Sequence, residues 1–278
     1  MKIMELEKIL NNVFINFDGK YSIYANDFNG NVLKLNSSEK YNAASCIKVY
    51  ILIAFLKKVY EEKKDINTKI KYEQENYVNG SGILQYLTPG LELSLKDIAT
   101  LMMIISDNVA TNIMIDYIGI DYINNTINEL GLLNTKLYSK FESCEDKVFG
   151  ETTAEDYGKV FELIANRKLW NESMTDEIIE ILKNQKYTEM VGDGIPKVYI
   201  DTENEFVKNV ITKSGKYQSV RNDGGIVITK YGQYILIIFI KDFNDQDYLN
   251  DEDIYNYGRK ISNIIFDRYI ALNGKFIK

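Results

Sequence analysis

The sequence NAASCIKVYILIAFL, residues 42–56, contains the most apolar stretch of the chain and a lysine just ahead of it. Residues 49–56 are all apolar, which is too apolar for a helix with a solvent-exposed face and too short to span a bilayer. We therefore predict a buried central helix that begins at Ser45. Lys48 lies one turn into this helix, on the same face as Ser45.

A lysine at this position has three explanations. Its ammonium group can reach water along a buried stem, pair with an acid, or be kept there for chemistry. Ser45 also has a purely structural role available, because serine commonly caps a helix N-terminus. The Ser45–Lys48 pair taken alone favours the capping serine and the solvent-reaching lysine.

The segments around the central helix predict an antiparallel sheet made from both chain ends. On the N-terminal side, an amphipathic surface helix (1–14) precedes two strands (20–27 and 31–38), which are joined by the turn DFNGN. On the C-terminal side, β-rich segments punctuated by glycine are followed by a helix; these are residues 207–215, 224–232 and 234–242 and then residues 253–270.

The middle of the chain predicts helices instead. Apolar residues recur with helical spacing in five segments, which are residues 93–105, 108–118, 121–131, 153–166 and 171–185. We expect an α+β fold with one domain over residues 1–278. Its α/β lobe would comprise residues 1–62 and 197–278, and an all-helical lobe would comprise residues 63–196, with the site where the lobes meet.

Composition excludes several classes of function. The formal net charge of -7 argues against nucleic acid or an anionic membrane as the partner. The chain has no histidine, so a Ser-His-Asp triad is impossible. Its two cysteines, Cys46 and Cys144, can form neither a disulfide framework nor the usual zinc site. We expect no metal and no cofactor.

The N-terminus also bears on location. The first residues lack the unbroken apolar stretch and the small-residue cleavage site of a secretory signal. As written, the chain is expected to be cytoplasmic, or extracytoplasmic if an export signal was removed.

Three short motifs occur in order and in matching contexts. Ser45–Lys48 opens the apolar helix, Ser106–Asn108 interrupts two helical patterns, and Lys213–Gly215 ends a β-rich run. Each has a structural alternative, since Ser106–Asn108 can cap a helix and Lys213–Gly215 can form a turn. A second Ser-x-x-Lys pair, Ser37 and Lys40, has no apolar helix after it and is interpreted as a solvated loop. The ordered set favours a catalytic function.

With these motifs the chain resembles class A β-lactamases and related penicillin-recognising serine hydrolases. The resemblance runs almost end to end, through GSGILQYL, LGLLNTKL, ETTAEDYGKVFELI and VRNDGGIVI; these are residues 80–87, 130–137, 151–164 and 220–228. It implies the two-lobed serine β-lactamase or DD-peptidase-like fold, with an active-site serine at the start of the central helix.

The resemblance also implies a catalytic set. Ser45 would be the nucleophile, and burial near a second cation, Lys213, would lower the pKa of Lys48 until it accepts the Ser45 proton. Ser106 would pass a proton to the leaving nitrogen. The backbone N–H groups of Ser45 and Lys216 would form the oxyanion hole.

The remaining candidates would bind substrate. Asn108 and Ser214 would hold the substrate amide and carboxylate, and Gly215 lies in the same binding stretch. Arg221 is a weaker candidate for the carboxylate, because an exposed strand arginine is an equally good interpretation. Cys46, next to the nucleophile, is expected to be a small buried apolar residue.

The loop that would support deacylation departs from the family pattern. Class A enzymes use a Glu-x-x-x-Asn segment, and this chain offers Glu142 with Asp146 in place of the asparagine. Glu145 is the second choice, and either glutamate can instead be a solvated loop acid. The distance from this segment to Thr152 is also shorter than usual.

The sequence therefore predicts a serine hydrolase that opens the β-lactam amide of a small-molecule substrate through an acyl-Ser45 intermediate. Two alternatives remain. One is a related DD-peptidase, esterase or amidase with slow deacylation, and the other is a penicillin-binding sensor that acylates once.

Overall fold

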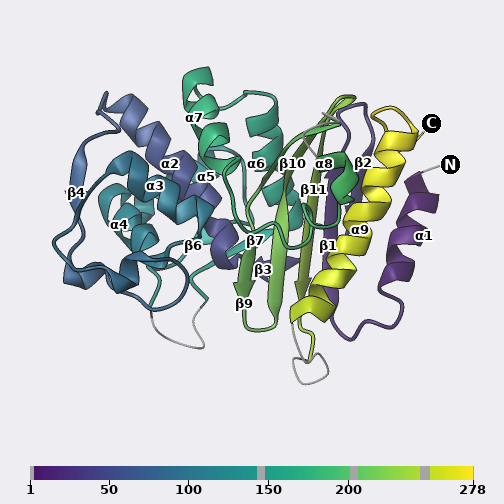
Figure 1. Cartoon of the computed structure of the whole chain (residues 1–278), viewed down its shortest axis with the longest axis horizontal. Coiled ribbons are helices and arrows are strands. Elements are labelled where there is room, and N and C mark those ends of the chain that lie inside the picture. The colour runs from purple at the N-terminus through teal and green to yellow at the C-terminus, as the bar shows by residue number, and fades with distance from the viewer. Residues whose placement is uncertain (1–2, 143–147, 201–205, 245–250, 278) are drawn as a thin grey trace.

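A six-stranded antiparallel sheet organises one half of the molecule (Figure 1). The computed structural model describes residues 3–142, 148–200, 206–244 and 251–277. The strand order is β2-β1-β11-β10-β8, and β9 also pairs with β10. These strands are β1 (Lys20–Asn26), β2 (Val32–Leu35), β8 (Val207–Thr212), β9 (Gly215–Tyr217), β10 (Val220–Thr229) and β11 (Gly232–Lys241). The prediction of a sheet built from both chain ends is confirmed.

Helices cover this sheet and form the other half of the molecule (Figure 1). They are α1 (Ile3–Val13), α2 (Ile47–Glu61), α3 (Leu95–Ile104), α4 (Asn108–Ile118), α5 (Ile120–Glu129), α6 (Ala154–Ala165), α7 (Glu172–Leu182), α8 (Lys197–Ile200) and α9 (Asp251–Ala271). Single 3₁₀ turns are η1 (Ala44–Cys46), η2 (Gln74–Asn76) and η3 (Leu84–Tyr86). Among the described residues, no helix has the length and apolarity needed to cross a membrane.

Both faces of the sheet are buried, because consecutive apolar residues of a strand point to opposite faces. On β11, Ile235, Ile237 and Phe239 join the core shared with the helical half, whereas Leu236, Ile238 and Ile240 pack under α1 and α9. Helix α6 covers the first of these faces, with contacts to β1, β10 and β11. The terminal helices thus flank the sheet, as the sequence predicts.

Helix α2 is the central helix of the other half. Most of its residues are buried, and it contacts α3, α4, α5 and α7. The predicted start needs a correction, because the α-helix begins at Ile47 and not at Ser45. Ser45 lies in the preceding 3₁₀ turn, η1, which tightens the entry into the helix.

Segment 63–196 contains short strands besides its helices, so it is not the all-helical lobe that the sequence predicts. These are β4 (Lys69–Lys71), β5 (Glu92–Ser94), β6 (Lys136–Leu137) and β7 (Gly150–Thr153), and β7 pairs with both β6 and β3 (Lys40–Asn42). One apolar core runs from the helices to the inner face of the sheet. The two halves are therefore packed together through a shared core.

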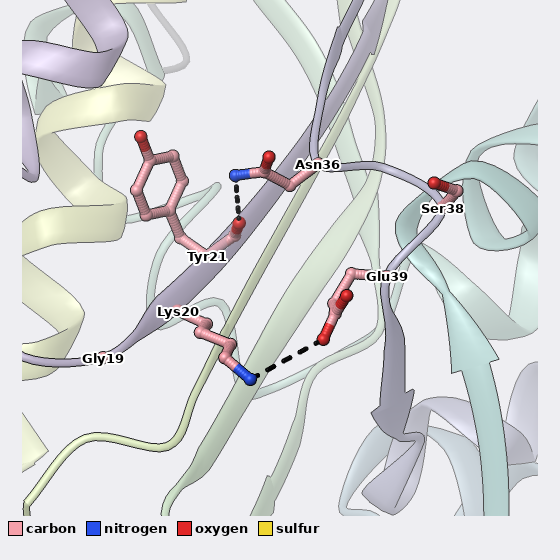
Figure 2. Close-up of a pocket in the computed structure, with 6 residues that line it drawn as sticks. All are labelled: Gly19, Lys20, Tyr21, Asn36, Ser38 and Glu39. Carbon is pink, nitrogen blue, oxygen red and sulfur yellow. Dashed lines mark hydrogen bonds and ion pairs between the residues drawn. The ribbon is translucent and has the colours of Figure 1, made fainter.

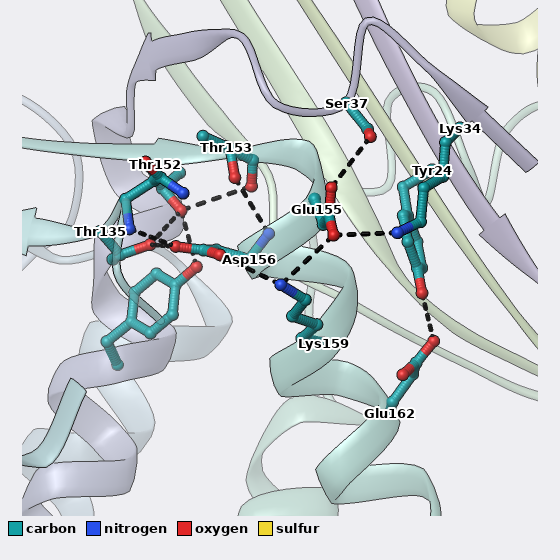
Figure 3. A network of polar contacts seen from close by, with 12 residues as sticks. Tyr24, Lys34, Ser37, Thr135, Thr152, Thr153, Glu155, Asp156, Lys159 and Glu162 are labelled. Atoms are coloured by element: carbon teal, nitrogen blue, oxygen red, sulfur yellow. Dashed lines mark hydrogen bonds and ion pairs between the residues drawn. The ribbon is translucent and has the colours of Figure 1, made fainter. Parts of the chain in front are cut away.

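A buried polar network joins these small strands to the central helix (Figure 3). The Tyr50 hydroxyl on α2 lies 2.8 Å from Thr152 Oγ1 on β7, which lies 2.8 Å from Thr135 Oγ1. Asp156 on α6 accepts hydrogen bonds from Thr135 Oγ1 at 3.1 Å and from the Asn134 N–H at 2.8 Å. The segment LGLLNTKL and the segment ETTAEDYG are thus locked to α2.

Candidate active site

The predicted nucleophile lies on a strained turn between β3 and α2. Ala44, just before Ser45, has φ of 45°, in a region that residues with a side chain seldom adopt. Asn42 Oδ1 accepts the Ala44 N–H at 2.9 Å, and Asn222 Nδ2 on β10 donates to the Asn42 carbonyl at 2.9 Å. These contacts hold Ser45, which is partly exposed, at the top of the central helix.

Lys48 is completely buried and points at the second motif. Its Nζ lies 2.6 Å from the Ser106 carbonyl oxygen, 3.0 Å from Ser106 Oγ and 2.8 Å from Asn108 Oδ1. In the described part of the chain, no hydrogen bond joins Ser45 to Lys48. Ser45 in η1 and Lys48 in α2 are three residues apart along continuous helical backbone, so their side chains lie on one face. Catalytic hydrogen bonds of this kind often form only when substrate binds.

Burial holds the pKa of Lys48 well below the ordinary lysine value, and the nearby charge of Lys213 lowers the pKa further. A neutral Lys48 amine can accept a proton, which an ammonium cannot. Because Lys48 is completely buried, its amine does not reach water along its stem. The first of the three explanations for a lysine at this position is therefore wrong.

The second motif is also held in a strained conformation. Ser106 has φ of 57°, and Asp107 caps α4 by accepting the Ala110 N–H at 2.9 Å. The other oxygen of Asp107 accepts the N–H groups of Ile83 at 2.7 Å and Leu84 at 2.9 Å. The predicted helix cap is thus correct, and the same carboxylate fixes the loop GSGIL against the site.

The third motif places a second lysine beside Ser106. Lys213 is fully buried, and its Nζ donates to Ser106 Oγ at 3.2 Å and to the Ser214 carbonyl at 2.6 Å. The Lys213 carbonyl oxygen accepts from the Tyr157 hydroxyl at 2.8 Å and from Cys46 Sγ at 3.4 Å. Burial raises the pKa of the Cys46 thiol to about 12, so Cys46 is neutral.

Gly215 brings the third motif against η1, the turn that carries Ser45. A Cβ at this position would lie 2.8 Å from the Ser45 backbone nitrogen and 3.0 Å from the Cys46 nitrogen, closer than a side chain can approach. The backbone N–H of Ser45 and strand β9 therefore lie side by side. Lys216 follows on β9 with an exposed side chain.

The structure places Arg221 on β10 opposite Lys216 on β9, but packs its guanidinium against Phe243. Arg221 and Asn222 are successive residues of β10, so their side chains leave the sheet on opposite faces. Asn222 faces the nucleophile turn, whereas the Arg221 guanidinium lies 5.2 Å from the Phe243 ring centroid and donates to the Val220 carbonyl at 2.8 Å. Arg221 is also buried, so the exposed-arginine interpretation is wrong.

Glu142 is exposed, and the residue before it faces the site instead. The Phe141 ring centroid lies 5.0 Å from Lys48 Nζ. Asn112 on α4 clamps Phe141 by two hydrogen bonds of 2.9 Å to its N–H and carbonyl groups. The sequence analysis missed Phe141 and Asn112. Glu145, Asp146 and Cys144 lie outside the described residues.

A separate polar hollow of about 430 Å³ lies beside the start of β1 (Figure 2). It is lined by Gly19, Lys20, Tyr21, Asn36, Ser38 and Glu39, which include none of the predicted site residues. Among the residues that the structure describes, no three His, Cys, Asp or Glu side chains are placed to hold a metal ion.

Comparison with known families identifies the fold and the family together. The sequence model of the Beta-lactamase enzyme family matches residues 5–269. The chain belongs to the beta-lactamase enzyme family. It is 34% identical over 107 residues to the beta-lactamase SME-1 of Serratia marcescens and 33% identical over 120 residues to a beta-lactamase of Bacillus subtilis (strain 168). These segments cover 36% and 42% of this chain, and 34% and 36% of the relatives, so the chain matches about a third of their length.

Solved structures of similar fold extend over nearly the whole chain. A beta-lactamase from Sphaerobacter thermophilus DSM 20745 has a TM-score of 0.85 and 22% identity, and the match covers 99% of this chain and 98% of that one. PBP-A has a TM-score of 0.84 and 23% identity, with 96% of each chain covered. At this level of identity the likeness establishes the two-lobed β-lactamase fold.

Proposed function

We propose that this member of the beta-lactamase family is a serine hydrolase of the class A type, which opens the β-lactam amide through an acyl-Ser45 intermediate. The observation that carries the proposal is the position of Ser106 Oγ, 3.0 Å from Lys48 Nζ and 3.2 Å from Lys213 Nζ. Two buried lysines on one hydroxyl provide a base and a proton donor in a protein without histidine.

Acylation would proceed as follows. Ser45 Oγ attacks the lactam carbonyl carbon while its proton passes to the neutral amine of Lys48. The backbone N–H groups of Ser45 and Lys216 stabilise the negative charge on the carbonyl oxygen. The C–N bond then breaks, and the nitrogen takes the Ser106 hydroxyl proton, which the Lys48 ammonium replaces.

Substrate binding would use the rest of the third motif. The positive charge of Lys213 and the Ser214 hydroxyl would hold the substrate carboxylate, and Gly215 leaves space for the substrate to lie along β9. Asn108 would position both Lys48 and the substrate amide, since its Oδ1 already accepts from Lys48. We leave Arg221 out of this set because its guanidinium packs against Phe243 and donates to the Val220 carbonyl.

A second candidate is a penicillin-binding hydrolase that deacylates slowly. The exposure of Glu142 and the position of Phe141 over Lys48 favour it, because hydrolysis of the ester requires a carboxylate that activates water. The fold neighbour PBP-A is compatible with either candidate, and the structure of one of its mutants is an acyl-enzyme complex with penicillin G.

Time-resolved mass spectrometry of the intact protein with benzylpenicillin tests both candidates. A mass increase on the peptide that contains Ser45, followed by its loss and by product release, would support the β-lactamase. A persistent adduct would support the slow hydrolase. If no adduct forms, neither proposal holds.

A further inference from the structure

The third motif lies where the pairing of β10 passes from one strand to another. Strand β8 ends its pairing with β10 at Thr212, and β9 begins its pairing with β10 at Gly215. Lys213 and Ser214 lie between these two ladders. The Lys213 N–H still donates to the Gly224 carbonyl at 3.1 Å. The nitrogen side of Lys213 is therefore attached to the sheet.

The carbonyl of Lys213 turns out of the sheet. In a regular antiparallel pair, the Gly224 N–H would return a hydrogen bond to the Lys213 carbonyl. The Gly224 N–H donates instead to Oδ1 of the neighbouring Asp223 at 2.8 Å, and this carboxylate is completely buried. The Lys213 carbonyl thus takes its donors from other elements.

Two side chains supply these donors. The Tyr157 hydroxyl on α6 donates to the Lys213 carbonyl at 2.8 Å, and the Cys46 thiol, next to Ser45 in η1, lies 3.4 Å from the same oxygen. A thiol is a weak donor, so the phenol supplies the main hydrogen bond. Tyr157 and Lys213 are both completely buried, so solvent does not compete for this contact. One carbonyl therefore joins the third motif to α6.

The ring of Tyr157 is packed on several sides. Its centroid lies 5.1 Å from that of Phe161, 5.5 Å from that of Phe239 and 6.0 Å from that of Tyr50. Burial raises the pKa of Tyr157 well above its ordinary value, so the hydroxyl keeps its proton and remains a donor. A fixed ring with a permanent donor can hold the carbonyl in one place.

We propose that Tyr157 is a positioning residue, which acts through the Lys213 carbonyl to orient the peptide between Lys213 and Ser214 for substrate binding. The inference rests on the proposed function, in which the side chains of these two residues hold the substrate carboxylate. The same peptide leads directly into Gly215, where a Cβ would lie 2.8 Å from the Ser45 nitrogen. The hydroxyl of Tyr157 thus also sets the approach of β9 to η1.

The contact can be followed in a single NMR signal of the full chain. Residues 213–214 form the only Lys-Ser sequence in the protein, so carbon-13 at the lysine carbonyl and nitrogen-15 in serine together mark one peptide. Tyr157→Phe removes the hydroxyl and keeps the ring. We expect the marked carbonyl signal to move upfield in this variant, because the carbonyl loses its main hydrogen bond.

Acylation by benzylpenicillin gives the functional measurement. Its rate at several benzylpenicillin concentrations, followed by intact-protein mass spectrometry, yields the dissociation constant of the first complex and the limiting rate. For Tyr157→Phe we expect acylation at low concentration to fall about tenfold, because Lys213 and Ser214 are displaced. Most of this loss should be a higher dissociation constant, since both residues bind the carboxylate.

The matched control is Tyr50→Phe. Tyr50 is as deeply buried as Tyr157, and its hydroxyl also makes one hydrogen bond of 2.8 Å, but to Thr152 Oγ1 on β7. We expect this variant to leave the marked carbonyl signal and both acylation constants unchanged. A loss of stability alone would lower the amount of active protein in either variant and would leave both constants as they are.

The inference is overturned if the marked carbonyl signal stays in place in Tyr157→Phe, or if this variant acylates with wild-type constants. Equal changes of the constants in Tyr157→Phe and Tyr50→Phe would assign Tyr157 a merely structural role and would also overturn it. If benzylpenicillin never labels the wild type, the proposed function fails, and the carbonyl signal still decides whether Tyr157 holds the third motif.

Discussion

Ser45 and Lys48 differ from the other Ser-x-x-Lys pair, Ser37 and Lys40, in their surroundings. Lys40 is exposed, with Glu151 3.8 Å away, but Ser37 is buried and lies 3.4 Å from Glu155. The interpretation of Ser37 as solvated is thus wrong, because the N-terminus of α6 packs against it. Neither residue contacts the other motifs, whereas Lys48 contacts Ser106 and Asn108.

Replacing Ser45 with Ala should abolish covalent labelling by benzylpenicillin and leave the fold intact, because the residue acts through its hydroxyl group. Intact-protein mass spectrometry measures the adduct, and thermal unfolding checks the fold. Ser37→Ala is the matched control and should label normally. Labelling of Ser45→Ala at the wild-type rate would remove Ser45 as the nucleophile.

Glu142→Gln tests the deacylation step. If Glu142 activates the water, the acylation burst should persist while deacylation slows by about a hundredfold to ten-thousandfold, the usual contribution of a general base. Burst kinetics with a chromogenic cephalosporin measure both steps. Glu145→Gln should have little effect, and the reverse result would transfer the role to Glu145.

If neither glutamate affects deacylation and the wild type already stalls, the slow hydrolase is the better function. The exposed position of Glu142 makes this comparison informative, because the side chain would have to turn inward past Phe141 to reach the acyl-enzyme. The mass spectrum of the wild type alone separates the two candidates.

At the scale of elements, the site depends on how closely β9 approaches η1. Gly215 is the point of contact, since any side chain there would meet the Ser45 backbone nitrogen at 2.8 Å. The three motifs lie on a 3₁₀ turn, a helix break and a strand end. Each of these elements ends at the candidate site, so small shifts between elements would alter the geometry of the proposed oxyanion hole.

Gly215→Ala should lower the acylation rate by about a hundredfold, because the strand must move away from the Ser45 N–H group. We expect little change in the thermal midpoint, since β9 is short and can shift outward. Stopped-flow acylation with a chromogenic cephalosporin measures the rate. An unchanged rate would show that the backbone of Ser45 does not need the close approach of β9.

At the scale of the whole molecule, the buried lysines lower the stability of the fold. Burial depresses the pKa of Lys48, so the unfolded chain binds more protons than the folded one between that lowered pKa and the ordinary lysine value. Stability from this group therefore rises with pH across that window. Below the window the cost of the buried charge is constant.

Lys48→Met removes this titration and fills the same space with an apolar side chain. The wild type should gain free energy of unfolding relative to the variant as pH rises, by about 1.4 kcal/mol per pH unit within the window. Urea denaturation at pH 6.5, 8 and 9.5 measures the difference. A constant difference would mean that Lys48 keeps its ordinary pKa.

The sequence by itself determined the order and type of the main elements and the family. Alternating and helical periodicities are local properties, and the strands and helices they predict form as expected. The three motifs could be found for the same reason, because each lies within a few residues of chain. The start of α2 was misplaced by two residues, since the 3₁₀ turn η1 depends on contacts from Asn42 and Asn222.

Only the tertiary structure decided which side chains meet. Phe141 lies over Lys48 because Asn112 holds it there, and Asn222 reaches the turn that carries Ser45 because β10 pairs with β9 in a register that places Asn222 opposite Gly215. Val191 and Asp223 are 32 positions apart in the chain, and a hydrogen bond from the Val191 N–H to the Asp223 carboxylate joins them. Such contacts depend on strand register and on long-range packing, which local patterns of sequence do not encode.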